Sequence, residues 1–146
     1  NMTKREIRYR NTALNGVFYY DTKEISEAQK INELGPLGFE EYCRERIKKL
    51  GYEVKTCQNY DGGIDIRAMK VLDNLETEYL IVQCKHWKTP IPPNEMRAFK
   101  TACDEEQSDY KKVKMFITSS RFSPSAKELA NKHNIIMING DDLIKQ

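Results

Sequence analysis

The sequence has no long apolar run, no paired cysteine motif and little net charge. No stretch of about 18 apolar residues occurs in its 146 residues, which argues against a membrane-spanning helix. The charged first ten residues are not followed by the apolar segment of a secretory signal, so we expect a cytoplasmic protein with no membrane partner. The formal net charge of +2 does not by itself indicate a nucleic-acid-binding protein.

The four cysteines, Cys43, Cys57, Cys84 and Cys103, are far apart, and none forms a Cys-x-x-Cys motif. With only two histidines in the chain, this spacing fits neither a zinc site nor a compact disulfide framework. All but Cys57 fall on apolar faces of the elements expected there. We therefore expect buried free thiols in a reducing compartment.

Basic residues gather in two parts of the chain. Residues 1–10 carry four Lys and Arg against one Glu, and residues 111–132 carry six against one. An acidic stretch, 104–109, precedes the second group. This asymmetry fits a basic surface that faces nucleic acid, and it fits an ordinary solvated surface equally well.

Helical and strand patterns alternate along most of the chain. Periodicity and turn residues predict, in chain order, a short helix over 27–34, a helix over 37–50, a strand over 52–57, central strands over 62–69 and 78–85, a helix capped by Asn94, a strand over 113–118, a helix over 124–133, a strand over 135–138 and a terminal helical turn after Gly140. This order predicts a mixed sheet with helices on both sides, because the three early strands can pair as a meander and helix-linked strands suit parallel crossovers.

The chain is expected to divide near residue 34. Residues 1–34 should form an N-terminal arm with a short helix, which a capping box from Ser26 to Gln29 begins. Residues 16–21 are either an edge strand or an ordered arm used in dimerisation. Residues 35–146 should form the main domain.

Polar residues interrupt the two central strands, which a turn at 73–74 joins. Because side chains alternate along a strand, Asp65 is expected on the face opposite Ile64 and Ile66. Gln83 and Lys85 share a face, opposed to Leu80, Val82 and Cys84. A carboxylate, an amide and an ammonium on strands that look buried are unusual and indicate a site.

The helix over 37–50 adds a further carboxylate. Phe39, Cys43, Ile47 and Leu50 form one apolar stripe, and Glu40 lies at its margin, where its carboxylate can reach the sheet. The other acids of this helix, Glu41 and Glu45, are expected on the opposite, solvent-facing side.

The segments Asp-Gly-Gly-Ile-Asp at 61–65 and Gln-Cys-Lys at 83–85 resemble the Mrr-like branch of the restriction-endonuclease-like, or PD-(D/E)xK, nuclease superfamily. In that branch glutamine replaces the usual acid of the second motif. Further similar segments lie at 38–40, 51–54, 118–119 and 122–124, so the resemblance covers about residues 34–144. It implies an α/β fold with a restriction-endonuclease-like core, a mixed central β-sheet flanked by helices, and the catalytic set Glu40, Asp65, Gln83 and Lys85.

These side chains suit phosphodiester hydrolysis, which needs charge neutralisation and an activated water. Asp65 is the best candidate ligand for Mg²⁺, with Mn²⁺ as a substitute, because magnesium prefers oxygen ligands. Gln83 could add its side-chain oxygen and Cys84 its backbone carbonyl, and Glu40 would complete the metal site. Lys85 could orient or deprotonate the water, or stabilise the phosphorane. With only two carboxylates, metal affinity should be weak.

Each of these side chains also has an ordinary structural explanation. Asp65 could be a solvated aspartate beside the glycine turn, and the polar residues of strand 78–85 could simply face solvent. Glu40 could be a plain surface carboxylate. Asp61 is explained better as a support of the glycine turn than as a catalytic group. His86 lies on the face opposite the lysine, which favours a non-catalytic role.

Candidate DNA contacts are Arg67, Trp87, Lys88, Thr118, Ser119 and Ser123. Trp87 could stack on a base or pack at the sheet edge. Thr118, Ser119 and the helix start at Ser123 could contact phosphates, and capping and turn formation explain them equally well.

We expect a Mg²⁺-dependent endodeoxyribonuclease that restricts foreign or modified DNA, a role that rests on the resemblance. The alternatives are a catalytically silent DNA-binding or oligomerisation module with a nuclease fold, and a nuclease for structured DNA or RNA. DNA is the expected partner, and a homodimer would allow double-strand cleavage.

Overall fold

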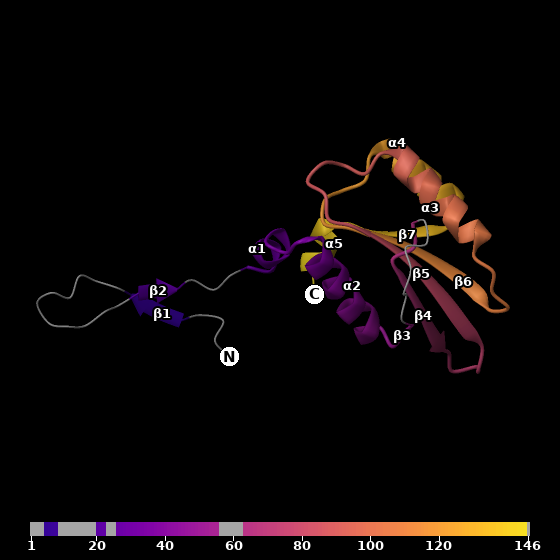
Figure 1. Ribbon diagram of the computed structural model, residues 1–146, viewed down its shortest axis with the longest axis horizontal. Helices are drawn as coiled ribbons and strands as arrows, with labels where there is room; N and C mark the ends of the chain where they lie inside the picture. Colours follow the sequence, from indigo (N-terminus) through magenta and orange to yellow (C-terminus); the bar gives the residue numbers. More distant parts are fainter. Residues whose placement is uncertain (1–4, 9–19, 23–25, 56–62, 146) are drawn as a thin grey trace, which may run out of the picture. The chain divides into compact units, whose positions relative to one another are not determined.

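The computed structural model describes residues 5–8, 20–22, 26–55 and 63–145 (Figure 1). The chain divides into two compact units, Asn1–Glu33 and Leu34–Gln146. In the first, strands β1 (Arg5–Arg8) and β2 (Tyr20–Thr22) pair antiparallel. The part of the 16–21 segment before β2 lies outside the described residues, and the use of this region in dimerisation stays a prediction.

Helix α1 (Glu27–Asn32) begins as the sequence predicts. The Ser26 hydroxyl accepts a hydrogen bond from the Gln29 backbone N–H at 3.1 Å. This contact satisfies one of the amide groups that a helix start leaves without a partner. The helix ends two residues earlier than the predicted range of 27–34.

The second unit is built on a five-stranded sheet in the order β3-β4-β5-β6-β7. Its strands are β3 (Glu53–Lys55), β4 (Ile66–Val71), β5 (Thr77–Lys85), β6 (Lys111–Thr118) and β7 (Ile135–Ile138). The β3-β4-β5 part is antiparallel and the β5-β6-β7 part is parallel. The mixed sheet that the element order predicts is therefore confirmed.

Helices cover both faces of this sheet (Figure 1). They are α2 (Pro36–Lys49), α3 (Pro93–Glu105), α4 (Pro124–Lys132) and the short α5 (Gly140–Ile144). Helices α3 and α4 lie together on one face, and α2 lies on the other. No helix in the described ranges has the length and apolar character that crossing a membrane requires.

The core on the α3–α4 side is an aromatic cluster. Phe116 of β6 makes edge-to-face contacts with Phe99 of α3 and Phe122, each with ring centroids 5.5 Å apart. Ile81 of β5 and Ile64 belong to the same cluster. Edge-to-face pairs of this kind add about 0.5–1.5 kcal/mol beyond the apolar area they bury. The cluster fixes α3 over β5, and this arrangement positions the polar residues described below.

Helix α2 buries Phe39, Cys43 and Ile47, as the predicted stripe requires. Leu50 does not belong to that buried stripe, because it caps the helix end and is 54% exposed. Gly51 follows with φ +95°, a left-handed conformation that glycine adopts without strain and that ends the helix as predicted.

Of the two helix starts near the site, the one at Ser123 is confirmed and the one at Asn94 is not. Ser123 caps α4 through its hydroxyl, which accepts from the Ala126 N–H at 3.1 Å, as predicted. The predicted cap at Asn94 is wrong. The cap is Pro92, and helix α3 begins at Pro93, two residues earlier than a cap at Asn94 requires, because proline suits the first helical position, where its missing N–H costs no hydrogen bond.

The prediction of buried free thiols is confirmed for Cys43 and Cys103. Cys84 is a free thiol that is only half-buried, and the reducing compartment stays a prediction. The Cys43 thiol beside Cys84, together with burial, raises the pKa of Cys84 well above its usual value. Cys57 lies outside the described residues.

Candidate active site

Asp65 lies at the point where β4 and β5 part. The regular pairing of the two strands begins at Ile66 and Val82, and the Asp65 N–H donates to the Val82 carbonyl at 2.8 Å. Beyond that, the Cys84 N–H donates to the Asp65 side chain at 2.8 Å instead of to a β4 carbonyl. The aspartate thus completes the hydrogen bonding of β5 while its carboxylate stays at the open end of the strand pair.

The backbone before Asp65 is irregular, and this changes the predicted alternation. Ile64 packs in the α3–α4 cluster with Ile81, whereas Ile66 pairs with Val82, which faces the other side of the sheet. The prediction that Ile64 and Ile66 share a face is therefore wrong. Gly63, three residues before β4 begins, has a φ of +109°, a conformation outside any strand, and regular alternation starts only at Ile66.

Gln83 is a buried polar residue, 6% exposed. Its side-chain oxygen, Oε1, has no hydrogen-bond partner among the described residues. That oxygen is directed at the glycine turn, because a Cβ placed on Gly63 would lie 3.7 Å from both Gln83 Oε1 and Ala102 Cβ. Leaving a buried carbonyl without a partner costs about 1–3 kcal/mol, so such groups are rare unless a ligand or water satisfies them. Its burial excludes the explanation that Gln83 is an ordinary solvent-facing residue.

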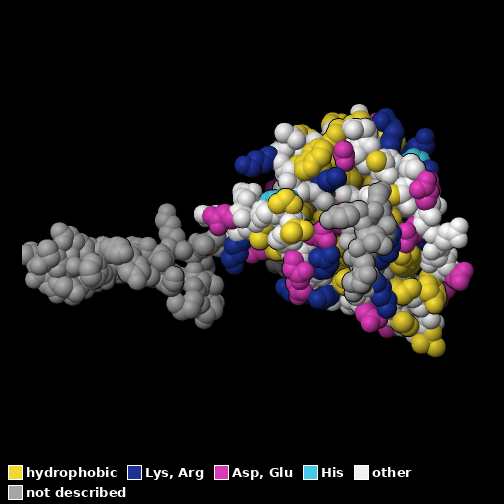
Figure 2. Space-filling model, viewed as in Figure 1, with side chains coloured by type: hydrophobic (Ala, Val, Ile, Leu, Met, Phe, Trp, Pro, Cys, Tyr) yellow, Lys and Arg dark blue, Asp and Glu magenta, His cyan; other side chains and the backbone are white. Residues whose placement is uncertain are grey.

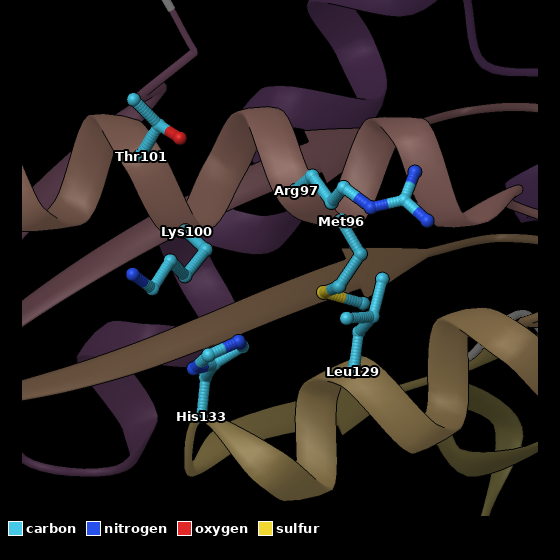
Figure 3. Close-up of a pocket in the computed structure, with 6 residues that line it drawn as sticks. All are labelled: Met96, Arg97, Lys100, Thr101, Leu129 and His133. Atoms are coloured by element: carbon cyan, nitrogen blue, oxygen red, sulfur yellow. The ribbon is translucent and has the colours of Figure 1, made fainter.

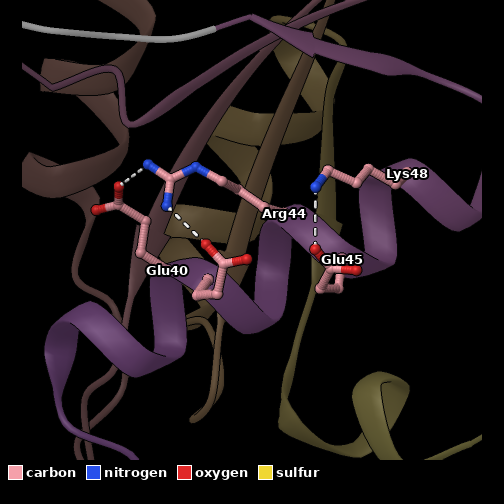
Figure 4. A network of polar contacts seen from close by, with 5 residues as sticks. Glu40, Arg44, Glu45 and Lys48 are labelled. Atoms are coloured by element: carbon pink, nitrogen blue, oxygen red, sulfur yellow. Dashed lines mark hydrogen bonds and ion pairs between the residues drawn. The ribbon is translucent and has the colours of Figure 1, made fainter.

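Glu40 is held by an arginine one turn along the same helix (Figure 4). The Arg44 guanidinium donates to Glu40 Oε2 at 2.5 Å and to Glu41 Oε1 at 3.4 Å. The side chains of Glu40 and Arg44 are 26% and 28% exposed, against 59% for Glu41. Glu45 pairs with Lys48 on the exposed side of the helix. Glu41 and Glu45 thus face solvent as predicted, and Glu40 does not.

The charges of these residues converge on Asp65. Burial raises the pKa of the Asp65 carboxyl, and the Cys84 N–H opposes that rise. The negative charge of Glu40 raises the pKa further, while the positive charges of Lys85 and Arg44 lower it. The negative charges of Glu40 and Asp65 repel each other, and a cation bound between them would relieve that repulsion.

Lys85 extends from the end of β5 between two partners. Its ammonium nitrogen lies 3.4 Å from Glu95 Oε1, in the first turn of α3. It also lies over the Trp87 ring, 5.8 Å from the centroid. Trp87 itself packs against the α3–α4 core, which supports the packing explanation for this residue.

The His86 side chain lies on the α2 side of the sheet, opposite Lys85. Its ring stacks on Phe39 of α2 with centroids 4.9 Å apart, and its Nδ1 lies 2.8 Å from Ser119 Oγ. These contacts fit the non-catalytic role that the alternation of the strand favours.

Several candidate DNA contacts are engaged within the protein. The Arg67 guanidinium pairs with both oxygens of Glu106, at 2.6 and 2.9 Å. Thr118 is fully buried, and its hydroxyl donates to the Lys85 carbonyl at 2.9 Å. The Ser119 hydroxyl donates to the Trp87 carbonyl at 3.2 Å. These contacts explain the three side chains as parts of the fold, and they do not favour a role in binding DNA.

Of the other candidates, Ser123 caps α4, and Lys88 is exposed, so a phosphate contact by Lys88 stays a prediction. On the face seen in Figure 2, basic and acidic side chains are interspersed. The basic nucleic-acid-facing side that the charge distribution allows also stays a prediction. Asp61, the proposed support of the glycine turn, lies outside the described residues.

Two residues of the site were missed by the sequence argument. Arg44 follows Glu40 at the four-residue spacing of helical ion pairs, a signal that could have identified it. Glu95 gave no local signal, because an acid in the first turn of a helix is common and only the fold brings it to Lys85.

A pocket of about 310 Å³ lies elsewhere, between α3 and the end of α4 (Figure 3). Its lining consists of Met96, Arg97, Lys100, Thr101, Leu129 and His133. None of the predicted site residues lines it. Among the described residues, no group of three or more His, Cys, Asp or Glu is arranged to hold a metal ion. A metal at the predicted site would therefore depend on neutral oxygens beside the two carboxylates.

The fold is similar to those of two solved restriction endonucleases and of a protein of unknown function. It resembles the DNA modification-dependent restriction endonuclease AspBHI with a TM-score of 0.61 and 13% identity, covering 90% of this chain and 41% of that one. It resembles the MspJI restriction endonuclease, solved in complex with a 27-mer oligonucleotide, with a TM-score of 0.53 and 16% identity, covering 72% and 25%. A protein of unknown function, AF1548, gives a TM-score of 0.56 and 19% identity, covering 68% and 55%.

The chain spans between a quarter and just over half of the length of these solved chains. At these identities the likeness shows the fold alone, and it confirms the restriction-endonuclease-like core. No curated protein matches the chain. The Mrr_cat family model, which describes a restriction endonuclease, matches residues 31–146, most of the chain. The chain therefore belongs to the Mrr_cat family of restriction endonucleases.

Proposed function

We propose that the chain is a divalent-metal-dependent endodeoxyribonuclease that acts in the restriction of foreign or modified DNA. The observation that carries the proposal is the Gln83 side-chain oxygen, buried and without a partner in the described part of the chain. It lies on the same strand as Lys85 and next to the glycine turn that leads into Asp65. Family membership supports nuclease chemistry at this place.

The donor atoms fit a hard divalent cation. Mg²⁺ and Mn²⁺ prefer carboxylate and carbonyl oxygens, and Asp65, Glu40 and the Gln83 amide offer these. A buried carbonyl without a partner and two mutually repelling carboxylates are both stabilised by a cation. The residues that would hold it are Asp65, Glu40, Gln83 through Oε1 and Cys84 through its backbone carbonyl.

A cation bound there would neutralise charge on the scissile phosphate and make a bound water more acidic. The residues of the chain have separate tasks. Asp65 stays fixed by the Cys84 N–H, so its free carboxylate oxygen has one direction. Arg44 holds the Glu40 carboxylate through a hydrogen bond along α2. Lys85 places a positive charge beside the reacting phosphate, where it would stabilise the developing negative charge.

Restriction of modified DNA is the finer part of the proposal. It is supported by two solved structures with a similar fold, one of a DNA modification-dependent restriction endonuclease and one of a restriction endonuclease bound to an oligonucleotide. Both proteins are much longer than this chain, so a shared substrate is part of the proposal. A homodimer would place two such sites on the two strands of a duplex.

Supercoiled plasmid, methylated or not, tests the proposal. The protein is incubated with each plasmid in Mg²⁺, Mn²⁺ or EDTA, and the nicked and linear products are separated on a gel. We expect cleavage with either metal, none in EDTA, and a preference for the methylated plasmid. Linear product without accumulated nicked circles would support a dimer. Absence of cleavage with both metals on both plasmids would reject the nuclease proposal, and equal cleavage of both plasmids would reject only the modification preference.

A further inference from the structure

Helix α3 brings a carboxylate to Lys85, from a part of the chain that the catalytic motifs do not include. Glu95 Oε1 lies 3.4 Å from the Lys85 ammonium nitrogen, and both side chains are partly buried, at 27% and 31% exposure. Glu40 lies on α2, and Asp65 lies directly before β4. Glu95 lies on α3, which covers the face of the sheet opposite α2.

The start of α3 is a rigid support for this carboxylate. Two prolines, Pro92 and Pro93, fix the backbone where the helix begins. The preceding residue, Ile91, is fully buried, and its N–H donates to the Arg121 carbonyl at 2.8 Å while its carbonyl accepts from the Ser123 N–H at 3.0 Å. Glu95 therefore sits on a segment that is anchored to the core, and its position is set independently of Lys85.

A lysine side chain has four rotatable bonds, so fixing its ammonium group in one place costs considerable conformational entropy. A partner that already restricts the side chain lowers that cost during catalysis. Glu95 on one side and the Trp87 ring on the other confine the Lys85 ammonium near the Gln83 side of β5. We propose that Glu95 is a positioning residue that holds Lys85 in its catalytic place. This inference rests on the proposed nuclease function and adds to it a residue outside the Asp65, Gln83 and Lys85 motifs.

Glu95→Gln tests the role, with Asp104→Asn as a matched control. Asp104 lies on the same helix and pairs with Lys100 at 2.6 Å, so its substitution also removes one ion pair from α3 but leaves the site alone. We expect Glu95→Gln to lower kcat for plasmid cleavage by about 10- to 100-fold, the usual loss for a residue that supports a catalytic group, with KM unchanged. Asp104→Asn should cleave like the wild type.

A double-mutant cycle shows whether Glu95 acts through Lys85. In the Lys85→Met background, Glu95→Gln should have no further effect on kcat, because the group that it positions is gone. Mn²⁺ affinity should be the same in Glu95→Gln and the wild type. Fully multiplicative losses in the cycle, an unchanged kcat in Glu95→Gln, or weakened Mn²⁺ binding would each overturn the positioning role.

A second readout does not depend on cleavage. Relaxation of the ¹⁵Nζ signal of Lys85 should report a restricted ammonium in the wild type and in Asp104→Asn, and a mobile one in Glu95→Gln. Glu95→Asp, which keeps the charge but is one methylene shorter, should give an intermediate result. If the wild type cleaves no DNA, the nuclease proposal fails while increased mobility in Glu95→Gln still supports the inference. Equal mobility in all variants would overturn it.

Discussion

The strip where α3 lies along β5 carries polar groups at both of its ends, and the two ends are built differently. At the far end, Glu106 accepts from both Arg67 and the Tyr79 hydroxyl, with distances of 2.5–2.9 Å. At the near end, the Gln83 oxygen has no partner among the described residues, and Lys85 reaches Glu95 at a looser 3.4 Å. The first end is closed by its own hydrogen bonds, and the second is open.

The difference separates polar residues that support the fold from those for which we propose a bound cation. Buried polar groups with a structural role are nearly always paired, as the Arg67–Glu106–Tyr79 cluster is. Burial and the Glu106 hydrogen bond raise the pKa of Tyr79 to about 12, so its hydroxyl stays a donor at any physiological pH. An unpaired buried oxygen at the open end reduces stability, and a bound cation would compensate for that loss.

The largest expected effect is on Asp65. Asp65→Asn should abolish metal-dependent cleavage with little change in stability, since its amide oxygen can still accept from the Cys84 N–H. Asp65→Ala should abolish cleavage as well and also lower the free energy of unfolding by about 1–3 kcal/mol, because that N–H loses its partner. Plasmid cleavage and urea denaturation measure the two effects. Nicking at the wild-type rate by Asp65→Asn would remove this residue from the mechanism.

Lys85 distinguishes catalysis from DNA binding. Lys85→Met should lower the cleavage rate by about 10²–10⁴-fold, the usual cost of removing a positioned catalytic group, with DNA affinity at low salt within several-fold of the wild type. If Lys85 only contacted a phosphate, its loss would instead weaken DNA binding and reduce the slope of log affinity against log salt concentration by about one. If the wild type cleaves no DNA and Lys85→Met only binds DNA less tightly, Lys85 belongs to a DNA-binding surface and not to an active site.

The two ends of the strip should respond to substitution in opposite ways. Arg67→Met at the closed end should lower the free energy of unfolding by about 1.5–3 kcal/mol, because it leaves Glu106 without its charged partner, and should not affect cleavage. Gln83→Met at the open end should leave the protein at least as stable as the wild type and remove cleavage, since it replaces an unpaired oxygen by an apolar group. Chemical denaturation paired with plasmid cleavage measures both. A destabilised Gln83→Met would mean that its oxygen has a structural partner.

The smallest expected effect is a pH dependence at the closed end. The Arg67 hydrogen bond lowers the pKa of Glu106 below its usual value of 4.5, although burial opposes this. Because the folded-state pKa is the lower one, the Glu106 contribution to stability is complete above about pH 4.5 and is lost as the pH falls through the folded value. The stability difference between the wild type and Glu106→Gln should therefore shrink below pH 4.5. A difference that stays constant down to pH 3 would argue against a lowered pKa.

Local patterns in the sequence were enough for most of the fold. The stripe of α2 and the cap at Ser123 depend on residues a few positions apart, so their periodicity and spacing are visible in the chain. The meander followed by parallel strands follows from the order of the elements and the lengths of their connections. The candidate set was identified through a family resemblance, and the structure places Glu40 and Lys85 each within electrostatic reach of Asp65.

What failed depends on contacts between distant segments. The alternation around Asp65 breaks because the backbone turns at Gly63, which no period-2 pattern reveals. The burial of Gln83 follows from α3 lying across its strand face. Glu95 meets Lys85 only after the chain has turned through three prolines. The burial of Gln83 and the Glu95–Lys85 contact both require the packing of α3 on β5, which residue spacing does not encode.

Binding of Mn²⁺ tests the contrast between the open and closed ends most directly. Electron paramagnetic resonance of free Mn²⁺, titrated with protein, counts bound ions without requiring cleavage. The account predicts a site in the wild type that Asp65→Asn abolishes, Gln83→Met weakens and Arg67→Met leaves unchanged. Binding that is equal in all four proteins, or absent in the wild type at millimolar Mn²⁺, would contradict it.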